Sequence, residues 1–314
     1  MWKLSDETIK QIQSADGSVR EVAKQLWVSK DSVSKYRKEL EQTLTQKRDK
    51  EWEKKLKLLE HYSAADIQEM LNYIAQNTKK EIDAVLGEPW HLKFALVSDT
   101  HLWAKWAAID ELGEFYDRAK EKWVECFVHA GDIVDWCDVY QGQQFEQSEV
   151  WFSEQLDSIR KSYPNVWLPT YFIGWNHDEA YLKKNWVNVV KAIETIRQDL
   201  IWLGFYDARL KLNGIDINLH HWWGSLSYAK DYKMKKYLDS MPVEWQPDIF
   251  ALGHYHTALY DLHRWIHGFM PGAFLKENLL AKRFNLDNTI WGWVIEVDKN
   301  EKGQSRVNME FIKF

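Results

Sequence analysis

Five short groups of polar residues follow apolar, strand-like segments, and together they carry the side chains of a metal site. They are Asp99-Thr100-His101, Gly131-Asp132, Asn176-His177-Asp178, His220-His221 and Gly253-His254-Tyr255-His256. Side chains two residues apart in a strand point to the same side, so Asp99 and His101 can hold one cation together. The two oxygens of the Asp132 carboxylate can bridge two cations. The series therefore predicts a site for two metal ions.

A pair of metal ions would give this site a specific chemistry. Two cations about 3.5–4 Å apart clamp the attacking and leaving oxygens of an in-line displacement at phosphorus, and water held between them becomes hydroxide near neutral pH. Histidine, carboxylate and amide donors without thiolate suit Mn, Fe or Zn. We therefore expect two divalent metal ions and hydrolysis of a phosphoric ester by a metal-bridging hydroxide.

The expected secondary structure places these groups at the ends of strands. Strands are expected at 94–97, 124–129, 168–173, 215–220, 248–252, 258–262 and 291–297, and helices at 107–120 and 144–162. Alternating strands and helices are typical of an α/β body. Open α/β sheets bind ligands on the loops that follow their strands, which is where the polar groups lie.

The five groups resemble, in the same order, the motifs of the calcineurin-like metallophosphoesterase family: D-x-H, G-D-x-x-D, G-N-H-D/E, a single H, and G-H-x-H. The resemblance covers about residues 91–300 and includes features of prokaryotic and phage members. It implies an α/β fold with a metallophosphoesterase-type β-sandwich flanked by helices. It also implies two ligand sets, the first made of Asp99, His101, Asp132 and His256, and the second of Asp132, Asn176, His220 and His254.

The resemblance further implies roles for residues around the ligands. His177 would protonate the leaving group, and Asp178 would orient His177. The segment 220–225 resembles a His-x-Gly-Gly-Gly-Ser/Thr stretch, so we prefer His220 as the ligand and leave His221 open. Asp135 fits either a residue that supports the site or an ordinary loop carboxylate.

The N-terminal segment predicts a small all-α helix-turn-helix. Ser18 and Glu21 have the spacing of a capping box at the start of one helix. Ser29 begins a second helix after the short connection Trp27-Val28. Two helices joined so closely, the second one basic, resemble a helix-turn-helix that binds DNA through residues 18–40. The expected DNA contacts are Lys30, Ser34, Lys35, Arg37 and Lys38, and a helical bundle that contacts protein is the alternative.

The chain divides into three expected parts: a helix-turn-helix domain (1–43), a helical linker (44–90) and a metallophosphoesterase domain (91–314). Residues 44–88 are rich in Lys, Glu and Gln, with apolar residues at helical spacing. This pattern is compatible with a coiled-coil homodimer.

The composition is ordinary for a soluble globular protein, with 45% hydrophobic and 28% charged residues and a net charge of −6. Residues 1–60 hold 14 lysines and arginines against 11 acidic residues, which is compatible with DNA contact at this end. No N-terminal stretch resembles a signal peptide, and no apolar run approaches the ~18 residues that a membrane span needs. We expect a cytoplasmic protein without membrane contact.

Tryptophan is unusually frequent, with 19 residues against 14 glycines. Several tryptophans occupy positions that favour glycine: Trp27, Trp103, Trp136, Trp175, Trp222 and Trp223. A backbone that only glycine tolerates would strain an indole-bearing residue. One hypothesis is that the source reads UGA as glycine where the sequence shows tryptophan. The alternative is that these indoles are real and form a rim that stacks nucleobases.

The function that the residues favour is a two-metal phosphoesterase that hydrolyses a phosphodiester, in a nucleic acid or a nucleotide, and carries a DNA-binding module. One alternative is a DNA-binding regulatory protein with an inactive phosphoesterase body. Another is a phosphoprotein phosphatase. Metal content separates the first alternative from the enzymes, and the preference for aryl diesters or monoesters separates the two enzymes.

Overall fold

The computed structural model describes residues 5–14, 18–36, 38, 81–135, 143–149, 152–185, 187–222, 224, 227–276 and 290–314. The chain divides into two compact units, Met1–Ala75 and Gln76–Phe314.

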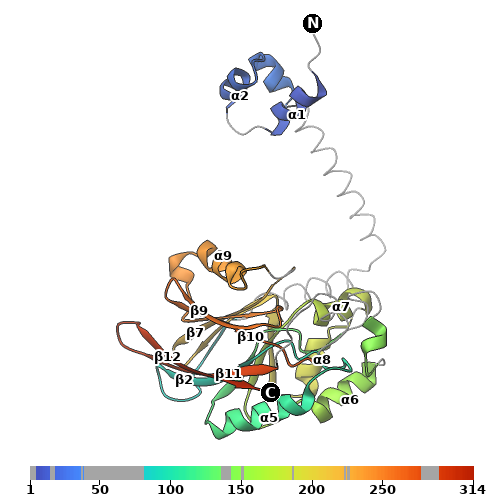
Figure 1. The fold of residues 1–314 in the computed structure, drawn as a ribbon, viewed down its shortest axis with the longest axis vertical. Helices are drawn as coiled ribbons and strands as arrows, with labels where there is room; N and C mark the ends of the chain where they lie inside the picture. The colour runs from blue at the N-terminus through green and yellow to red at the C-terminus, as the bar shows by residue number, and fades with distance from the viewer. Residues whose placement is uncertain are drawn as a thin grey trace, which may run out of the picture. The chain divides into compact units, whose positions relative to one another are not determined.

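The C-terminal unit is built around two six-stranded sheets (Figure 1). The first sheet has the order β12 (Ser305–Lys313), β11 (Trp291–Lys299), β2 (His91–Val97), β3 (Cys126–His129), β4 (Thr170–Gly174) and β5 (Leu200–Phe205). The second has the order β1 (Glu81–Ala84), β6 (Asp207–Leu212), β7 (Ile215–His221), β8 (Ile249–Gly253), β10 (Ile266–Pro271) and β9 (Ala258–His263).

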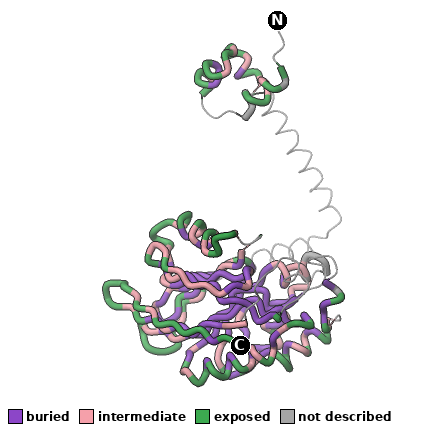
Figure 2. Tube along the Cα trace, in the orientation of Figure 1, coloured by how far each residue is buried: buried purple, intermediate pink, exposed green. Residues whose placement is uncertain are grey.

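Helices cover the outer face of each sheet. On the first sheet lie α5 (Ile109–Glu121), α6 (Phe152–Ser162) and α8 (Val189–Ile196), and on the second lies α9 (Tyr232–Ser240) (Figure 1). Helix α7 (Asn176–Asn185) follows β4 directly, and two short 3-10 helices, η1 (Gln143–Glu146) and η2 (Val243–Trp245), lie in loops. Figure 2 shows that the buried residues gather in the two sheets.

Strand β2 illustrates why the sheets stack. Leu92, Phe94 and Leu96 belong to the core between the two sheets, whereas Ala95 and Val97 belong to the core under the helices. Parallel strands covered on both faces are nearly continuous apolar runs, as β2 and β3 are. The expected α/β body, with a β-sandwich flanked by helices, is confirmed.

Two local expectations were wrong. Residues 81–84 were expected in a helical linker, but they form β1, which pairs in parallel with β6. The sequence does not indicate this strand, because it is short and alternates charged with apolar residues. The helix expected over 144–162 is divided, since 143–146 form η1 and α6 begins only at Phe152. Residues 44–80 of the expected linker lie outside the described residues, and residues 85–90, which the structure describes, form no helix.

The N-terminal unit contains α1 (Asp6–Ser14), α2 (Val19–Gln25) and a helical segment at 30–36. The expected capping box is confirmed, because the backbone N–H of Ser18 donates to Glu21 (2.7 Å) and that of Glu21 donates to the Ser18 hydroxyl (3.3 Å).

A small apolar core joins α2 to the helical segment at 30–36. Val22 and Ala23 of α2 pack with Val33 of the 30–36 segment. None of the helices that the structure describes has the length and apolar character needed to span a bilayer.

Candidate metal centre

The loops after parallel strands bring most of the expected ligands to one place. Strands β2, β3 and β4 are parallel neighbours in the first sheet, and β7 and β8 are parallel neighbours in the second. The ends of these strands carry Asp99, His101, Asp132, Asn176, His221, His254 and His256. Since the carboxyl ends of neighbouring parallel strands lie at one edge of a sheet, the two sheets contribute side chains to a common site.

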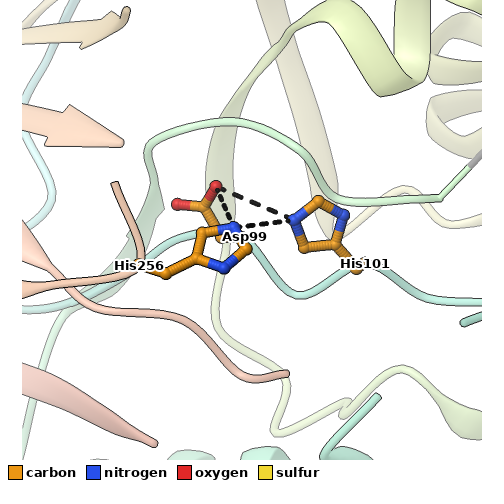
Figure 3. A group of neighbouring side chains, drawn as sticks. All are labelled: Asp99, His101 and His256. Carbon is orange, nitrogen blue, oxygen red and sulfur yellow. Dashed lines mark hydrogen bonds and ion pairs between the residues drawn. The ribbon is translucent and has the colours of Figure 1, made fainter. Parts of the chain in front are cut away.

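Asp99, His101 and His256 form the first donor cluster (Figure 3). The Nε2 atoms of the two histidines are 3.1 Å apart. Asp99 Oδ1 lies 3.3 Å from His256 Nε2 and 3.8 Å from His101 Nε2. Figure 3 shows the three side chains pointing toward one another. Two imidazole nitrogens and one carboxylate oxygen so arranged can hold a single cation.

Asp132, His221 and His254 form the second donor cluster. His221 Nε2 lies 3.2 Å from Asp132 Oδ2. The other ring nitrogen of His221, Nδ1, donates a hydrogen bond to the carbonyl of Ala130 (2.6 Å). This bond fixes the tautomer and leaves the lone pair of Nε2 to bind a metal ion. His254 Nε2 likewise donates to the carbonyl of Gly224 (2.9 Å), so that Nδ1 is the atom left to bind a cation.

Three buried atoms of the site have no hydrogen-bond partner among the residues that the structure describes: Asp99 Oδ1, Asn176 Oδ1 and His221 Nε2. Buried polar atoms are costly when nothing pairs with them. Two oxygens and an imidazole nitrogen are suitable ligands for a divalent metal, so the donor set fits such ions. Asn176 lies between Trp175 and His177 in the chain, and both neighbours contact the second cluster.

His221, and not the preferred His220, belongs to this cluster. Successive side chains of a strand point to opposite faces. His220 is on the other face of β7, where its ring stacks 4.5 Å from that of Tyr237 and 6.3 Å from that of Phe250. The preference for His220 relied on the residues that follow it. The alternation of apolar residues at 215, 217 and 219, which are buried between the sheets, would have indicated position 221.

The charges of the site suit cation binding. Burial alone would raise the pKa of Asp99 and Asp132, but nearby imidazoles, with His221 foremost, hold the pKa of both carboxyls well below the ordinary range. Burial lowers the pKa of His254 to about 4, so this imidazole is neutral at neutral pH. The carboxylates are therefore ionised and the His254 lone pair is available.

A family model for calcineurin-like phosphoesterases matches residues 92–292. The chain belongs to this family. It is accordingly a metal-dependent phosphoric ester hydrolase by family, and the two donor clusters contain side chains that could hold the metal.

Solved structures that match this calcineurin-like phosphoesterase are distant. They include an archaeal phosphodiesterase (14% identity, TM-score 0.40, 70% of this chain and 100% of the other). Another is a predicted phosphoesterase from Streptococcus pneumoniae (14% identity, TM-score 0.36, 70% of this chain and 98% of the other). A third is Vps29 from Entamoeba histolytica in complex with zinc (14% identity, TM-score 0.34, 71% of this chain and 99% of the other). A search of curated proteins finds no match.

Most of the candidate metal ligands of this phosphoesterase have a left-handed backbone. The φ angles are 51° at Asp99, 41° at His101, 54° at Asp132, 92° at His254 and 49° at His256. For residues with a Cβ, such conformations cost of order 1–3 kcal/mol each, and they cluster at functional sites. The surrounding structure holds these ligands in positions that an isolated loop would not adopt.

Glycine allows the strand ends to approach closely. A Cβ at Gly131 would lie 2.4 Å from His221 Nδ1, so the position before Asp132 requires glycine. A Cβ at Gly253 would lie 2.4 Å from the carbonyl oxygen of Ala130. Both glycines therefore allow the two sheets to approach closely at the candidate metal centre.

Asp135 is the partner of His177, a role that the sequence assigned to Asp178. His177 Nδ1 lies 2.5 Å from Asp135 Oδ1, and Gln143 donates to the same oxygen at 2.7 Å. Asp178 instead accepts the backbone N–H groups of Val134 (3.0 Å) and Trp175 (2.8 Å). Asp178 thus fixes the two loops, while Asp135 orients the imidazole.

The tryptophans expected at glycine positions divide into several groups. Trp27 and Trp103 have positive φ angles, 55° and 80°. Trp175 and Trp222 do not, and the Trp175 ring lies 5.5 Å from that of His221, against the second cluster. Trp136 and Trp223 lie outside the described residues.

Proposed function

We propose that this calcineurin-like phosphoesterase binds two divalent ions, Mn, Fe or Zn, and hydrolyses a phosphodiester in a nucleic acid or nucleotide. The contact between the two donor clusters is the observation that carries the proposal. His221 Nε2 lies 3.2 Å from Asp132 Oδ2 in its own cluster and 3.6 Å from Asp99 Oδ1 in the other. Donor atoms so close together support adjacent cations, as a two-metal mechanism requires.

The proposed ligand sets follow the clusters, with His221 in place of His220. The first set is Asp99, His101, Asp132 and His256, and the second is Asp132, Asn176, His221 and His254. When bound, the two ions would stabilise negative charge on the phosphoryl group and activate a water molecule.

His177 is the proposed proton donor to the leaving group. Its ring lies 4.7 Å from that of His101, so it stands beside the first cluster. Burial alone would lower the pKa of His177, but Asp132 and Asp135 outweigh burial and raise it to about 9. The imidazole is therefore protonated at neutral pH. Asp135 holds Nδ1, which leaves Nε2 to donate the proton.

A pocket lined by residues of α9 and by Trp222, which follows His221, supports a nucleic-acid or nucleotide substrate. Its volume is about 290 Å³, and it is lined by Trp222, Tyr232, Lys233, Lys236, Tyr237 and Ser240. Lys233 Nζ lies 5.8 Å from the ring centroid of Tyr255, the residue between His254 and His256. Aromatic rings stack bases and lysines attract phosphates, so the side chains of this pocket suit a nucleotide or a nucleic-acid strand.

DNA binding by the N-terminal unit remains a proposal. Lys30, Ser34, Lys35 and Lys38 are exposed, whereas Arg37 lies outside the described residues. Replacing Lys35 and Lys38 by Ala in the full chain should weaken binding to duplex DNA and flatten its salt dependence. Unchanged DNA affinity would favour the helical bundle that contacts protein. Dimerisation through 44–88 is likewise a prediction, and sedimentation of the full chain tests it.

Hydrolysis of bis-p-nitrophenyl phosphate, compared with p-nitrophenyl phosphate, tests the proposed activity. The metal-loaded enzyme should turn over the diester faster than the monoester. Preference for the monoester would favour the phosphoprotein phosphatase. Failure to bind metal and to cleave either substrate would favour the inactive regulatory protein.

A further inference from the structure

Five exposed tryptophans have a backbone that tryptophan rarely adopts. The φ angles are 55° at Trp27, 66° at Trp90, 62° at Trp123, 66° at Trp167 and 66° at Trp265. Their exposed fractions run from 51% to 96%. A bulky residue with positive φ is a conformational outlier, and tryptophan is usually well buried. Neither the backbone nor the surroundings of these positions suit an indole.

Two of these residues occupy the position after a helix where glycine is the usual residue. Trp27 follows α2, and the next N–H, that of Val28, donates to the carbonyl of Ala23 (3.0 Å). Trp123 follows α5, and the N–H of Val124 donates to the carbonyl of Ala119 (3.4 Å). A left-handed residue followed by this bond back across the last turn is the Schellman motif, which favours glycine.

Two others, Trp90 and Trp167, lie outside helices and strands. Trp90 follows Pro89 in a turn closed by a bond from the N–H of His91 to the carbonyl of Glu88 (3.2 Å). Proline followed by a residue with positive φ is the pattern of a type II turn, where glycine takes the second place. Trp167 has the same left-handed backbone in the loop before β4.

The fifth residue has an internal counterpart with glycine. The β9–β10 hairpin turns through Arg264 (φ 51°) and Trp265 (φ 66°). The β6–β7 hairpin turns through Asn213 (φ 52°) and Gly214 (φ 85°). Two-residue hairpin loops with both central φ angles positive strongly favour glycine in the second place. Trp265 therefore stands where the other hairpin of the same kind has glycine.

Trp202 shows what a tryptophan position looks like in this chain. It lies within β5, its side chain is 1% exposed, and its indole donates to the carbonyl of Gly204 (2.9 Å). Trp103 shares a positive φ of 80° with the five, but it is buried and its indole donates to the carbonyl of Gln155 (2.9 Å). Positive φ and exposure coincide at the five positions and at neither of these two.

We infer that residues 27, 90, 123, 167 and 265 are glycines in the protein as its source makes it. A single cause accounts for all five: UGA codons that the source decodes as glycine and that the sequence shows as tryptophan. The ratio of 19 tryptophans to 14 glycines agrees with such a change. The inference rests on backbone geometry and solvent exposure, and it stands whether or not the proposed hydrolysis is found.

Peptide mass spectrometry of the protein isolated from its source tests the inference directly. We expect glycine at the five positions and tryptophan at position 202 in the same digest. Trp202 is the internal control, because it shows that tryptophan peptides are recovered. Peptides with tryptophan at the five positions would overturn the inference.

Thermal unfolding of recombinant protein provides an independent test. In the full chain as written, Trp90→Gly, Trp123→Gly, Trp167→Gly and Trp265→Gly should each raise Tm by roughly 2–4 °C, because each relieves a left-handed residue with a Cβ. The matched control Trp202→Gly should lower Tm by roughly 6 °C or more, because it removes a buried side chain. An unchanged or lower Tm in the first four variants would contradict the inference.

Discussion

His177 in the first turn of α7 and Asp135 in the loop after β3 meet with His177 Nδ1 2.5 Å from Asp135 Oδ1. The same carboxylate oxygen lies 3.4 Å from Nδ1 of His101, a residue of the first donor cluster. Burial alone would raise the pKa of Asp135, but the imidazoles of His177 and His101 lower it to about 2. One ionised carboxylate thus orients both the proposed proton donor and a proposed ligand.

Replacing Asp135 by Asn should reduce turnover about 10–100-fold while metal remains bound, because the amide orients the imidazole less well. The measurement is kcat together with metal content. Asp178→Asn is the matched control, since the Asp178 carboxylate caps backbone N–H groups. The Asp178→Asn variant should have a lower Tm than the unaltered enzyme, while its kcat should fall less than that of Asp135→Asn. Equal turnover in Asp135→Asn and the unaltered enzyme would contradict the assigned partnership.

His177→Ala should leave the metals bound and slow turnover by about 10²–10⁴. The raised pKa of about 9 keeps this imidazole protonated through neutral pH, so the proton is lost only as pH rises through that value. Activity of the unaltered enzyme should therefore decline on the alkaline side, and the variant should lack this decline. A variant with the same rate and the same pH profile would remove His177 from the mechanism.

The two neighbouring histidines of β7 provide a matched pair. His221→Ala should lose metal from the second cluster, because it removes a buried nitrogen aimed at Asp132. His220→Ala should keep its metal and lose stability, because its ring stacks on Tyr237. Metal content and Tm distinguish the two. If His220→Ala loses metal while His221→Ala keeps it, the assignment from the structure is wrong.

Asp132→Asn tests the bridging role. A neutral amide binds cations less well than a carboxylate and cannot bridge two of them as readily. Binding of both ions should therefore weaken, which calorimetric titration with Mn or Zn would show as loss of affinity at both steps. Full retention of both ions would refute the bridge.

Much of the fold could be predicted because the strands that carry the ligands are apolar runs followed by polar groups. The strands β2 and β3 could be predicted from their apolar residues, since both are buried on two faces. The strand β1 could not be recognised from the sequence, because its alternating charged residues resemble the charged sequence of residues 44–80 that precedes it. The site was predictable in residue type. The partner of His177 was not, because Asp135 and Asp178 both stand near it in sequence and only the loop geometry separates them.

The decisive measurement for the proposed two-metal mechanism is the number of metal ions that the chain binds, followed together with diester hydrolysis. Metal-free full-length protein would be titrated with Mn or Zn, and bound metal and bis-p-nitrophenyl phosphate hydrolysis would be measured at each step. We expect two ions per chain and a rate of diester hydrolysis that rises only as the second metal site fills. Full activity with one ion or none, or two bound ions without hydrolysis of any phosphoric ester, would contradict it.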